Sequence, residues 1–334
     1  MLNELARMLA SLQAPALDLL WCALAFAALA FLARGVPSWR TARAAAGEVS
    51  TNLTLFAIDT LFVAPALAVA LAALGAWMQS GGFILIDPNT WTIWPVWGVV
   101  TAAIFAGDFI GYWRHRLEHT PPLWPAHAIH HSDTTMTWTT GLRFHPINRF
   151  STALIDTGAL ALLGFPPWAL AANNLVRHYY GLFIHADLPW TYGLLGRVFV
   201  SPAMHRWHHV RDGQKQRTLN SPHFDGGRGA NLKSKVALGN SESKASLDLK
   251  CDTEPDPSRG SHLRSDALGV GANFATLFSV FDQVFRTYYA PGPCSAPLGV
   301  PASIGRGALA QLAWPFRVLA ANFKQRRASR STSY

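Results

Sequence analysis

The sequence predicts an all-α integral membrane protein, a helical bundle with a histidine-rich, metal-binding cap on its cytoplasmic side. Half of the 334 residues are hydrophobic and only 14% are charged, against roughly 25% in soluble domains. Long apolar segments occupy much of the first half of the chain, and three clusters of histidines follow them. These observations favour membrane helices that end at a metal site.

Three apolar segments, residues 15–33, 53–78 and 91–113, are long enough to cross a bilayer. A helix rises about 1.5 Å per residue, so about 20 residues span the hydrocarbon core. The loop between the first two segments is rich in arginine, whereas residues 79–90 contain neither Lys nor Arg. The positive-inside rule therefore places residues 34–43 in the cytoplasm, and the third segment returns His115 to that side.

A fourth apolar stretch, residues 153–185, is interrupted by Pro166 and Pro167. This stretch is either one span or a hairpin. If the histidines on either side of it share a metal site, the chain between them must cross the bilayer an even number of times, and roughly 33 residues are too few for two crossings of about 20 residues each. We therefore expect a re-entrant or short-helix hairpin that turns at the prolines and brings His185 back to the cytoplasmic side.

The remaining chain is predicted to divide by composition. Residues 1–14 form an interfacial N-terminal segment, 15–213 and 269–323 the membrane and histidine-bearing domain, 214–268 a polar, disordered insert, and 324–334 a basic tail. The insert has no periodic apolar pattern, so its His223 and His262 are expected to face solvent. After the insert, the spacing of the phenylalanines predicts an amphipathic helix over residues 271–289.

The charge and the cysteines exclude two other classes of protein. The net charge of +9 is explained by arginine-rich loops on one side of a membrane, and no basic and aromatic interleaving indicates nucleic-acid binding. The three cysteines are scattered and odd in number, so they predict neither a disulfide framework nor a cysteine zinc site.

The histidines recur at spacings that place them on one helix face. His115 and His119 are four residues apart, and both a second and a third cluster contain the i, i+3 and i+4 positions that are neighbours on a helix. His185, which lies between the second and third clusters, is added to them. The candidate metal ligands are then His115, His119, His127, His130, His131, His185, His205, His208 and His209. Each cluster is expected to present its imidazoles together.

Nine imidazoles are too many for one zinc ion, which takes four ligands. They suit two metal ions with about four or five protein ligands each, and neutral imidazole binds iron, zinc, copper and nickel. Ordinary surface histidines are the simpler explanation of one cluster, but three clusters of matching spacing argue against it.

Two alternatives stay open. The stretch from His115 to His119 matches the H-x-x-E-H pattern of inverted zinc peptidases, in which Glu118 is the general base. A non-catalytic membrane protein that binds a metal or haem is the other alternative.

Asp108 shares a helix face with His115, and a buried acid near the membrane boundary needs a partner; we expect it to accept a proton from a ligand ring.

Motifs over residues 108–289 resemble the fatty acid hydroxylase/sterol desaturase superfamily. They are D-x-x-x-Y-x-x-H-R-x-x-H from Asp108, H-x-x-H-H-S from His127, R-x-H-P from Arg143, the single His185, H-R-x-H-H from His205 and N-x-x-x-x-F-S-x-x-D from Asn273. The resemblance implies a membrane-embedded non-haem di-iron oxygenase, with two iron ions held by the nine histidines. It places His145 in an outer or weaker position.

The resemblance also implies the partners. These are a lipid substrate from the bilayer, O2 and a separate electron donor such as a reductase, ferredoxin or cytochrome, at a bacterial inner membrane. Sterol, fatty acyl, alkylglycerol and carotenoid substrates stay open, as does hydroxylation versus desaturation. The chain departs from the family where some members carry H-x-x-x-H and this chain has Gly181 and His185. His178 is the nearest substitute, although a position facing the interface is favoured for it. The insert at residues 214–268 is the second departure.

Overall fold

The computed structural model describes residues 2–35, 40, 43–210, 272–290, 292, 294, 296–300 and 304–331. The predicted insert, with His223 and His262, lies outside the described residues. The all-α prediction is confirmed within the described part of the chain, where the β-structure consists of two isolated bridges, Phe199 to Phe278 and Val210 to Leu298.

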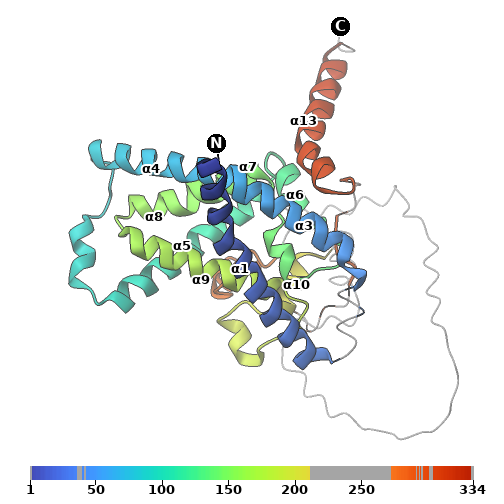
Figure 1. Ribbon diagram of the computed structural model, residues 1–334, viewed down its shortest axis with the longest axis horizontal. Helices are drawn as coiled ribbons and strands as arrows, with labels where there is room; N and C mark the ends of the chain where they lie inside the picture. The colour runs from blue at the N-terminus through green and yellow to red at the C-terminus, as the bar shows by residue number, and fades with distance from the viewer. Residues whose placement is uncertain are drawn as a thin grey trace, which may run out of the picture.

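Figure 1 shows the arrangement of the helices. The α-helices are α1 (Leu2–Arg34), α3 (Ala46–Ile58), α4 (Ala64–Ser80), α5 (Val96–Glu118), α6 (Trp124–His131), α7 (Pro146–Ser151), α8 (Gly158–Leu162), α9 (Pro167–His185), α10 (Pro202–His208), α12 (Val280–Val284) and α13 (Ala308–Ser331). The π-helical turns are η1 (Asp59–Val63) and η4 (Thr152–Thr157), and the 3-10 turns are η2 (Pro88–Ile93), η3 (Trp138–Leu142) and η5 (Gly193–Arg197).

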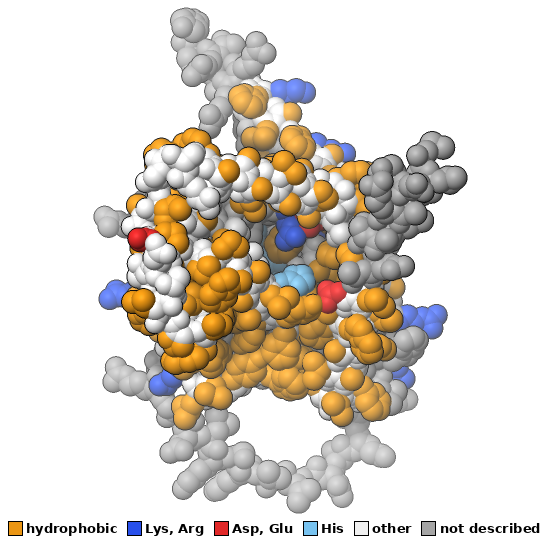
Figure 2. Space-filling view, turned by 60° about the vertical axis from the view of Figure 1, so that its left-hand side comes forward, with side chains coloured by type: hydrophobic (Ala, Val, Ile, Leu, Met, Phe, Trp, Pro, Cys, Tyr) orange, Lys and Arg blue, Asp and Glu red, His pale blue; other side chains and the backbone are white. Residues whose placement is uncertain are grey.

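In the part of the chain that the structure describes, three helical stretches are long and apolar enough to cross a membrane: Pro15–Ala33 in α1, Ala46–Ser80 across α3, η1 and α4, and Val96–Glu118 in α5. The three predicted spans are confirmed as helices, with shifted bounds. The third begins later than predicted because residues 88–93 form η2 and Pro95 then precedes α5. Large hydrophobic side chains stay exposed on these helices, and Figure 2 shows a largely hydrophobic face with a recess that contains charged and histidine side chains.

The predicted hairpin is present. One arm runs through α7, η4 and α8 and the other is α9, and the chain turns between Leu163 and Pro166. Gly164 has a φ of +69°, and a Cβ there would lie 2.1 Å from the carbonyl oxygen of Ile86, so only glycine fits this close approach. The second arm ends at His185, beside the other histidines.

Helices α5 and α9 pack closely because two glycines of α5 leave room for polar side chains of α9. A Cβ at Gly107 would lie 2.2 Å from the Asn173 Oδ1, and one at Gly111 would lie 1.9 Å from the Arg177 Nη2. The Arg177 side chain of α9 therefore reaches the buried Asp108 inside the bundle.

The amphipathic helix predicted over residues 271–289 is wrong. Among the described residues 272–289, only Val280–Val284 is helical, and Asn273 has a φ of +63°. Two buried carboxylates instead accept the backbone N–H groups of this segment. Asp108 accepts from Leu277 and Phe278, at 3.1 and 2.7 Å. Asp282 accepts from Phe274 and Ala275, at 2.7 and 3.1 Å. The aromatic side chains still pack on α5, around the buried Tyr112.

The two ends of the chain are helical. Helix α1 continues from residue 2 through the first span, and α13 extends through most of the predicted basic tail, away from the bundle in Figure 1. Their interfacial roles and the predicted domain boundaries stay predictions.

Candidate metal centre

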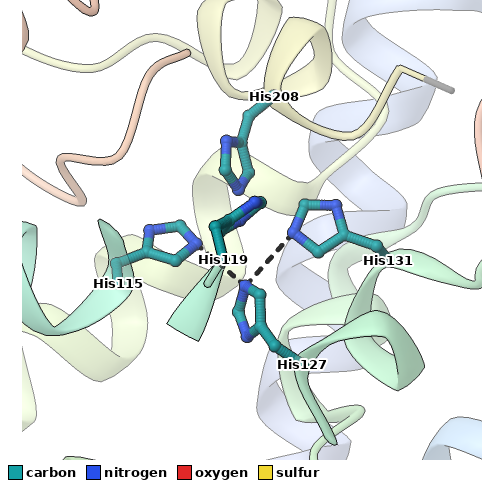
Figure 3. A group of neighbouring side chains, drawn as sticks. All are labelled: His115, His119, His127, His131 and His208. Carbon is teal, nitrogen blue, oxygen red and sulfur yellow. Dashed lines mark hydrogen bonds between the residues drawn. The ribbon is translucent and has the colours of Figure 1, made fainter. Parts of the chain in front are cut away.

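The nine predicted ligands converge from four helices onto two adjacent groups. Group one is His115, His119, His127, His131 and His208, and group two is His130, His185, His205 and His209. In each group one ligand atom from every residue lies within 4.8 Å of the others. Figure 3 shows the rings of group one pointing toward a common centre. All but His119 are buried, and His119 is partly buried.

The expectation that each sequence cluster forms one spatial group is wrong. In α6 the i and i+4 residues His127 and His131 belong to group one, while His130 belongs to group two. In α10 and its C-cap, His205 and His209 belong to group two, while His208 belongs to group one. Positions i and i+4 share a helix face more closely than i and i+3, so each short helix divides its rings between the two groups.

The spacing of the ring nitrogens fits metal ligands. The Nε2 atom of His127 is 3.1 Å from that of His115 and 3.2 Å from that of His131. In group two, the Nε2 of His185 is 3.1 Å from that of His130 and 3.0 Å from that of His205. Two ligands about 2.1 Å from one ion, at angles between square and tetrahedral, have nitrogens roughly 3.0–3.4 Å apart.

The outward ring nitrogens are held by backbone carbonyls. His115 Nδ1 donates to Phe274 O at 2.8 Å and His208 Nδ1 to Ala272 O at 2.6 Å. In group two, His130 Nδ1 donates to Arg143 O at 3.3 Å and His185 Nδ1 to Gly181 O at 2.5 Å. A carbonyl only accepts, so in the neutral rings the proton is on Nδ1 and the Nε2 lone pair points inward.

The facing lone pairs of His130 and His185 would repel each other without a positive charge between them. A hydrogen bond cannot join them, because both rings have placed their single proton on the outward nitrogen. A metal ion accepts such lone pairs. The nitrogen positions therefore fit a bound cation.

Burial keeps these rings in the form that binds metal. Desolvation lowers the pKa of His127, His130, His131 and His209 well below its usual value, and the neighbouring histidines lower it further. Neutral imidazole is the ligand form. These four rings thus need no deprotonation at neutral pH before they coordinate an ion.

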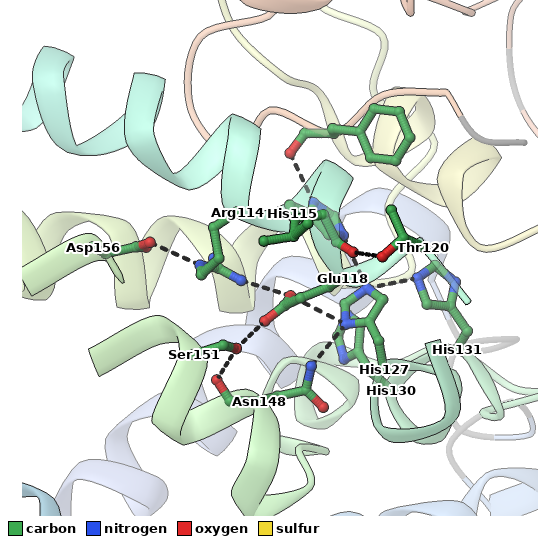
Figure 4. A network of polar contacts seen from close by, with 12 residues as sticks. Arg114, His115, Glu118, Thr120, His127, His130, His131, Asn148, Ser151 and Asp156 are labelled. Atoms are coloured by element: carbon green, nitrogen blue, oxygen red, sulfur yellow. Dashed lines mark hydrogen bonds and ion pairs between the residues drawn. The ribbon is translucent and has the colours of Figure 1, made fainter. Parts of the chain in front are cut away.

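Glu118 supports group one in a role that the sequence did not indicate. Its Oε2 lies 3.3 Å from His127 Nδ1 and 2.7 Å from Arg114 Nη1, and its Oε1 accepts from Ser151 (Figure 4). A carboxylate on the outer nitrogen orients a ligand histidine and raises its basicity. Because both oxygens are engaged, the peptidase alternative, in which Glu118 acts as a free base, is disfavoured.

Buried charges continue from Glu118 along the bundle. Arg114 Nε donates to Asp156 Oδ1 at 2.8 Å, Arg177 Nη1 donates to Asp156 Oδ2 at 2.8 Å, and Arg177 Nε lies 3.6 Å from Asp108 Oδ1. Acids and arginines alternate, so each buried charge has an opposite neighbour. We call this row, from Glu118 to Asp108, the ion chain.

The three residues predicted for outer positions lie elsewhere. Asp108 accepts backbone N–H groups of the segment that carries Phe274 rather than a proton from a ring, so the expected direct pairing is wrong and its effect on His115 is indirect. His145 caps α7, accepting from Ile147 N, and His178 is exposed beside Tyr179. Both lie outside the two groups.

Comparison with known proteins gives consistent matches. Residues 100–226 match the family model of fatty acid hydroxylases. The chain is 26% identical to the ornithine lipid hydroxylase of Rhizobium tropici over 67% of this chain and 52% of the relative. It is 33% identical to the alkylglycerol monooxygenase of Danio rerio and 31% to that of Homo sapiens, over 37% and 33% of this chain.

The matches cover only part of each relative. The chain spans about half of the ornithine lipid hydroxylase, and 26% and 25% of the fish and human alkylglycerol monooxygenases. No solved structure matches the chain.

Proposed function

We propose that this chain, which matches the fatty acid hydroxylase model over residues 100–226, is an O2-dependent, di-iron lipid hydroxylase of the fatty acid hydroxylase/sterol desaturase superfamily. The observation that carries the proposal is the convergence of nine imidazoles on two groups beside the C-terminal end of α5, a candidate membrane span. Two relatives are named as a lipid hydroxylase and a monooxygenase, which supports a lipid substrate.

The proposed reaction inserts one atom of O2 into a C–H bond and reduces the other to water, using two electrons and two protons. Bound iron would supply the redox chemistry of O2. Groups one and two would each hold one ion through their inward nitrogens. A desaturase would use the same inputs but release both oxygen atoms as water.

The chain's own residues would fix the geometry of this centre. The carbonyls of Phe274, Ala272, Arg143 and Gly181 set the ring tautomers, and Glu118 orients His127. The ion chain ties Glu118 to the packed helices α5 and α9. Rigid support of this kind holds ligands in a productive geometry without reorganisation during turnover.

The electron donor is proposed to be a separate protein, a reductase, ferredoxin or cytochrome, as the resemblance to the hydroxylase superfamily implies. Arg34, Arg40 and Arg43 support a cytoplasmic position for the loop after α1, and we propose that the membrane is a bacterial inner membrane. His115 and His119, at the C-terminal end of α5, would then lie on that same side, together with the other histidines of the two groups.

Lipid analysis tests this function. Membranes from cells that express the wild type should contain a lipid one oxygen atom heavier than its precursor, and isotopically labelled O2 should deliver that atom. His130→Ala should insert normally into the membrane and yield no such product. A product that lacks the label, or full turnover by His130→Ala, would contradict the assignment; loss of hydrogen without gain of oxygen would make the chain a desaturase.

A further inference from the structure

An apolar groove lies between the first two membrane helices. It has a volume of about 1140 Å³, and its walls are α1 and α3. From α1 it is lined only by apolar side chains: Ala16, Leu19, Leu20, Ala23, Phe26, Ala27 and Ala30. Helix α1 packs on the bundle through Leu19, Cys22 and Phe26, and the small alanines beside these contacts leave the space open.

The groove ends against the elements that hold group two. Its remaining lining residues include Thr137, Trp138 and Thr139 at η3, and Ala186, the residue after His185. Trp138 stacks on Phe26 of α1, with ring centroids 5.4 Å apart. At the other end of η3, a Cβ on Gly141 would lie 3.3 Å from His185 Nδ1. One short turn thus contacts the groove and a ring of group two.

Polar contacts fix this end of the groove. Asn52 of α3 donates to Thr139 Oγ1 at 3.0 Å and to Asp133 Oδ2 at 3.1 Å. Thr140 donates to the same Asp133 oxygen at 2.7 Å. The turn is therefore held to α3 by buried hydrogen bonds, so that the position of Trp138 relative to the groove is set by the fold.

The size of the groove indicates its occupant. From Ala16 to Ala30 the α1 wall is about 21 Å long at 1.5 Å per residue. If a chain carbon needs about 30 Å³, the share of a water molecule in the liquid, an 18-carbon chain needs about 540 Å³, which is less than the groove volume of about 1140 Å³. Both walls belong to candidate membrane spans, so the molecules at its mouth are lipids. The apolar α1 wall suits hydrocarbon, which needs no hydrogen-bonding partner.

We propose that the groove between α1 and α3 binds the linear hydrocarbon chain of an acyl or alkyl membrane lipid, with the carbon to be oxidised at the Trp138 end, beside group two. The statement about the reacting carbon rests on the proposed function; the binding of the chain does not. Small residues at Ala23 and Ala57, which face the groove from opposite walls, determine the space for the chain.

Photolabelling in proteoliposomes tests the proposal. The probe is a phosphatidylcholine with a diazirine in one acyl chain, and labelled peptides are mapped by mass spectrometry. The wild type should be labelled on the groove face of α1 and α3. Filling the groove with Ala23→Trp or Ala57→Trp should reduce that labelling by about tenfold.

Two matched substitutions control for general effects of tryptophan. Leu24→Trp and Leu61→Trp lie on the same helical stretches, at exposed positions outside the groove lining, and should leave groove labelling unchanged. Bound metal and elution volume, measured on all four variants, identify any variant that has failed to fold. Equal labelling of all four folded variants would overturn the proposal.

Two parallel experiments test the other possible occupants of the groove, a sterol and a second copy of the chain. A sterol diazirine that labels the groove while the acyl probe does not would overturn the linear-chain assignment. Efficient disulfide cross-linking of Ala23→Cys between two chains would mean that a second copy covers the groove, and would also overturn it.

The outcome separates this inference from the proposed function. Labelling of the groove that persists in His130→Ala, which should not turn over, supports binding independently of oxidation. If the wild type oxidises lipid and Ala23→Trp and Ala57→Trp match it in both turnover and labelling, the groove assignment is wrong while the proposed function stands.

Discussion

The two histidine groups lie side by side, and each has rings that are held by backbone carbonyls, but group one also has a carboxylate partner. In group one, the Glu118 carboxylate lies beside His127 and belongs to the ion chain that crosses α5 and α9. In group two, His130 and His185 donate to neutral backbone carbonyls. A carboxylate makes the ligand ring more basic than a carbonyl does. We therefore expect group one to hold its ion more tightly, while group two lies next to the groove.

The largest effect is expected from removing a ligand of group two. His185→Ala should lower turnover by more than about 100-fold, because loss of an outer partner alone costs about 10–100-fold. Iron bound per chain should fall by about one half, with group one still loaded. Iron is measured by mass spectrometry of the purified protein, and His178→Ala, outside both groups, is the control. Complete loss of iron would show that the groups do not load separately.

The carboxylate support of group one is tested by Glu118→Gln. The substitution removes the negative charge beside His127 and Arg114 but keeps the shape of the side chain. Metal affinity of group one and turnover should fall by about 10–100-fold, while group two stays loaded.

Glu48→Gln is a matched control for the Glu118 experiment. Glu48 pairs with Arg143 at 2.6 Å but contacts that residue's side chain, whereas His130 uses its carbonyl. This change should alter neither the metal affinity of either group nor the turnover by more than a few-fold. Equal losses from Glu118→Gln and Glu48→Gln would contradict the comparison.

Chelation provides a third test. Titration of the loaded protein with a competing chelator should remove iron in two steps, and the first step should be absent from His185→Ala. Because group one has the Glu118 carboxylate, its affinity for iron should exceed that of group two by about tenfold or more. A single step for the wild type, or loss of the second step in His185→Ala, would mean that the two groups bind iron equally tightly or in the reverse order.

The smallest effect concerns pH. Burial raises the pKa of Asp282 to about 6, against about 3.9 when unfolded. The folded protein therefore binds this proton more tightly, so the contribution of Asp282 to the free energy of unfolding is greatest below pH 4. That contribution falls by up to about 3 kcal/mol as the pH rises from about 4 to about 6.

Thermal unfolding in detergent between pH 4 and 7 measures this dependence. Asp282→Asn removes the titrating group, so the wild type should lose stability relative to the variant as the pH rises. Asp282 accepts the N–H groups of Phe274 and Ala275, next to the carbonyls that support His115 and His208. Ionisation of Asp282 should therefore affect the support of group one. Parallel stability curves for the two proteins would contradict this role.

Sequence periodicity predicted the parts of the fold that depend on local spacing. The apolar segments became membrane-length helices, Pro166 and Pro167 mark the turn of the hairpin, and the nine imidazoles converge. The division of rings between groups was missed, although i, i+4 spacing contains that signal in α6 and α10.

The remaining errors have tertiary causes. The Phe274 carbonyl that holds His115 is 159 residues away in sequence, and no local pattern indicates such a pairing. The phenylalanine spacing after residue 271 matches a helix, but Asp108 and Asp282 accept the backbone N–H groups that a helix would use. Asp156 binds Arg114 of α5 and Arg177 of α9, which are 42 and 21 residues away in sequence, so no local pattern indicates the ion chain.

The metal content of the purified wild type tests the central claim most directly. Two imidazole groups that each hold one ion predict about two irons per chain and no haem absorbance. One zinc per chain, haem, or no metal retained by the folded protein would contradict the account.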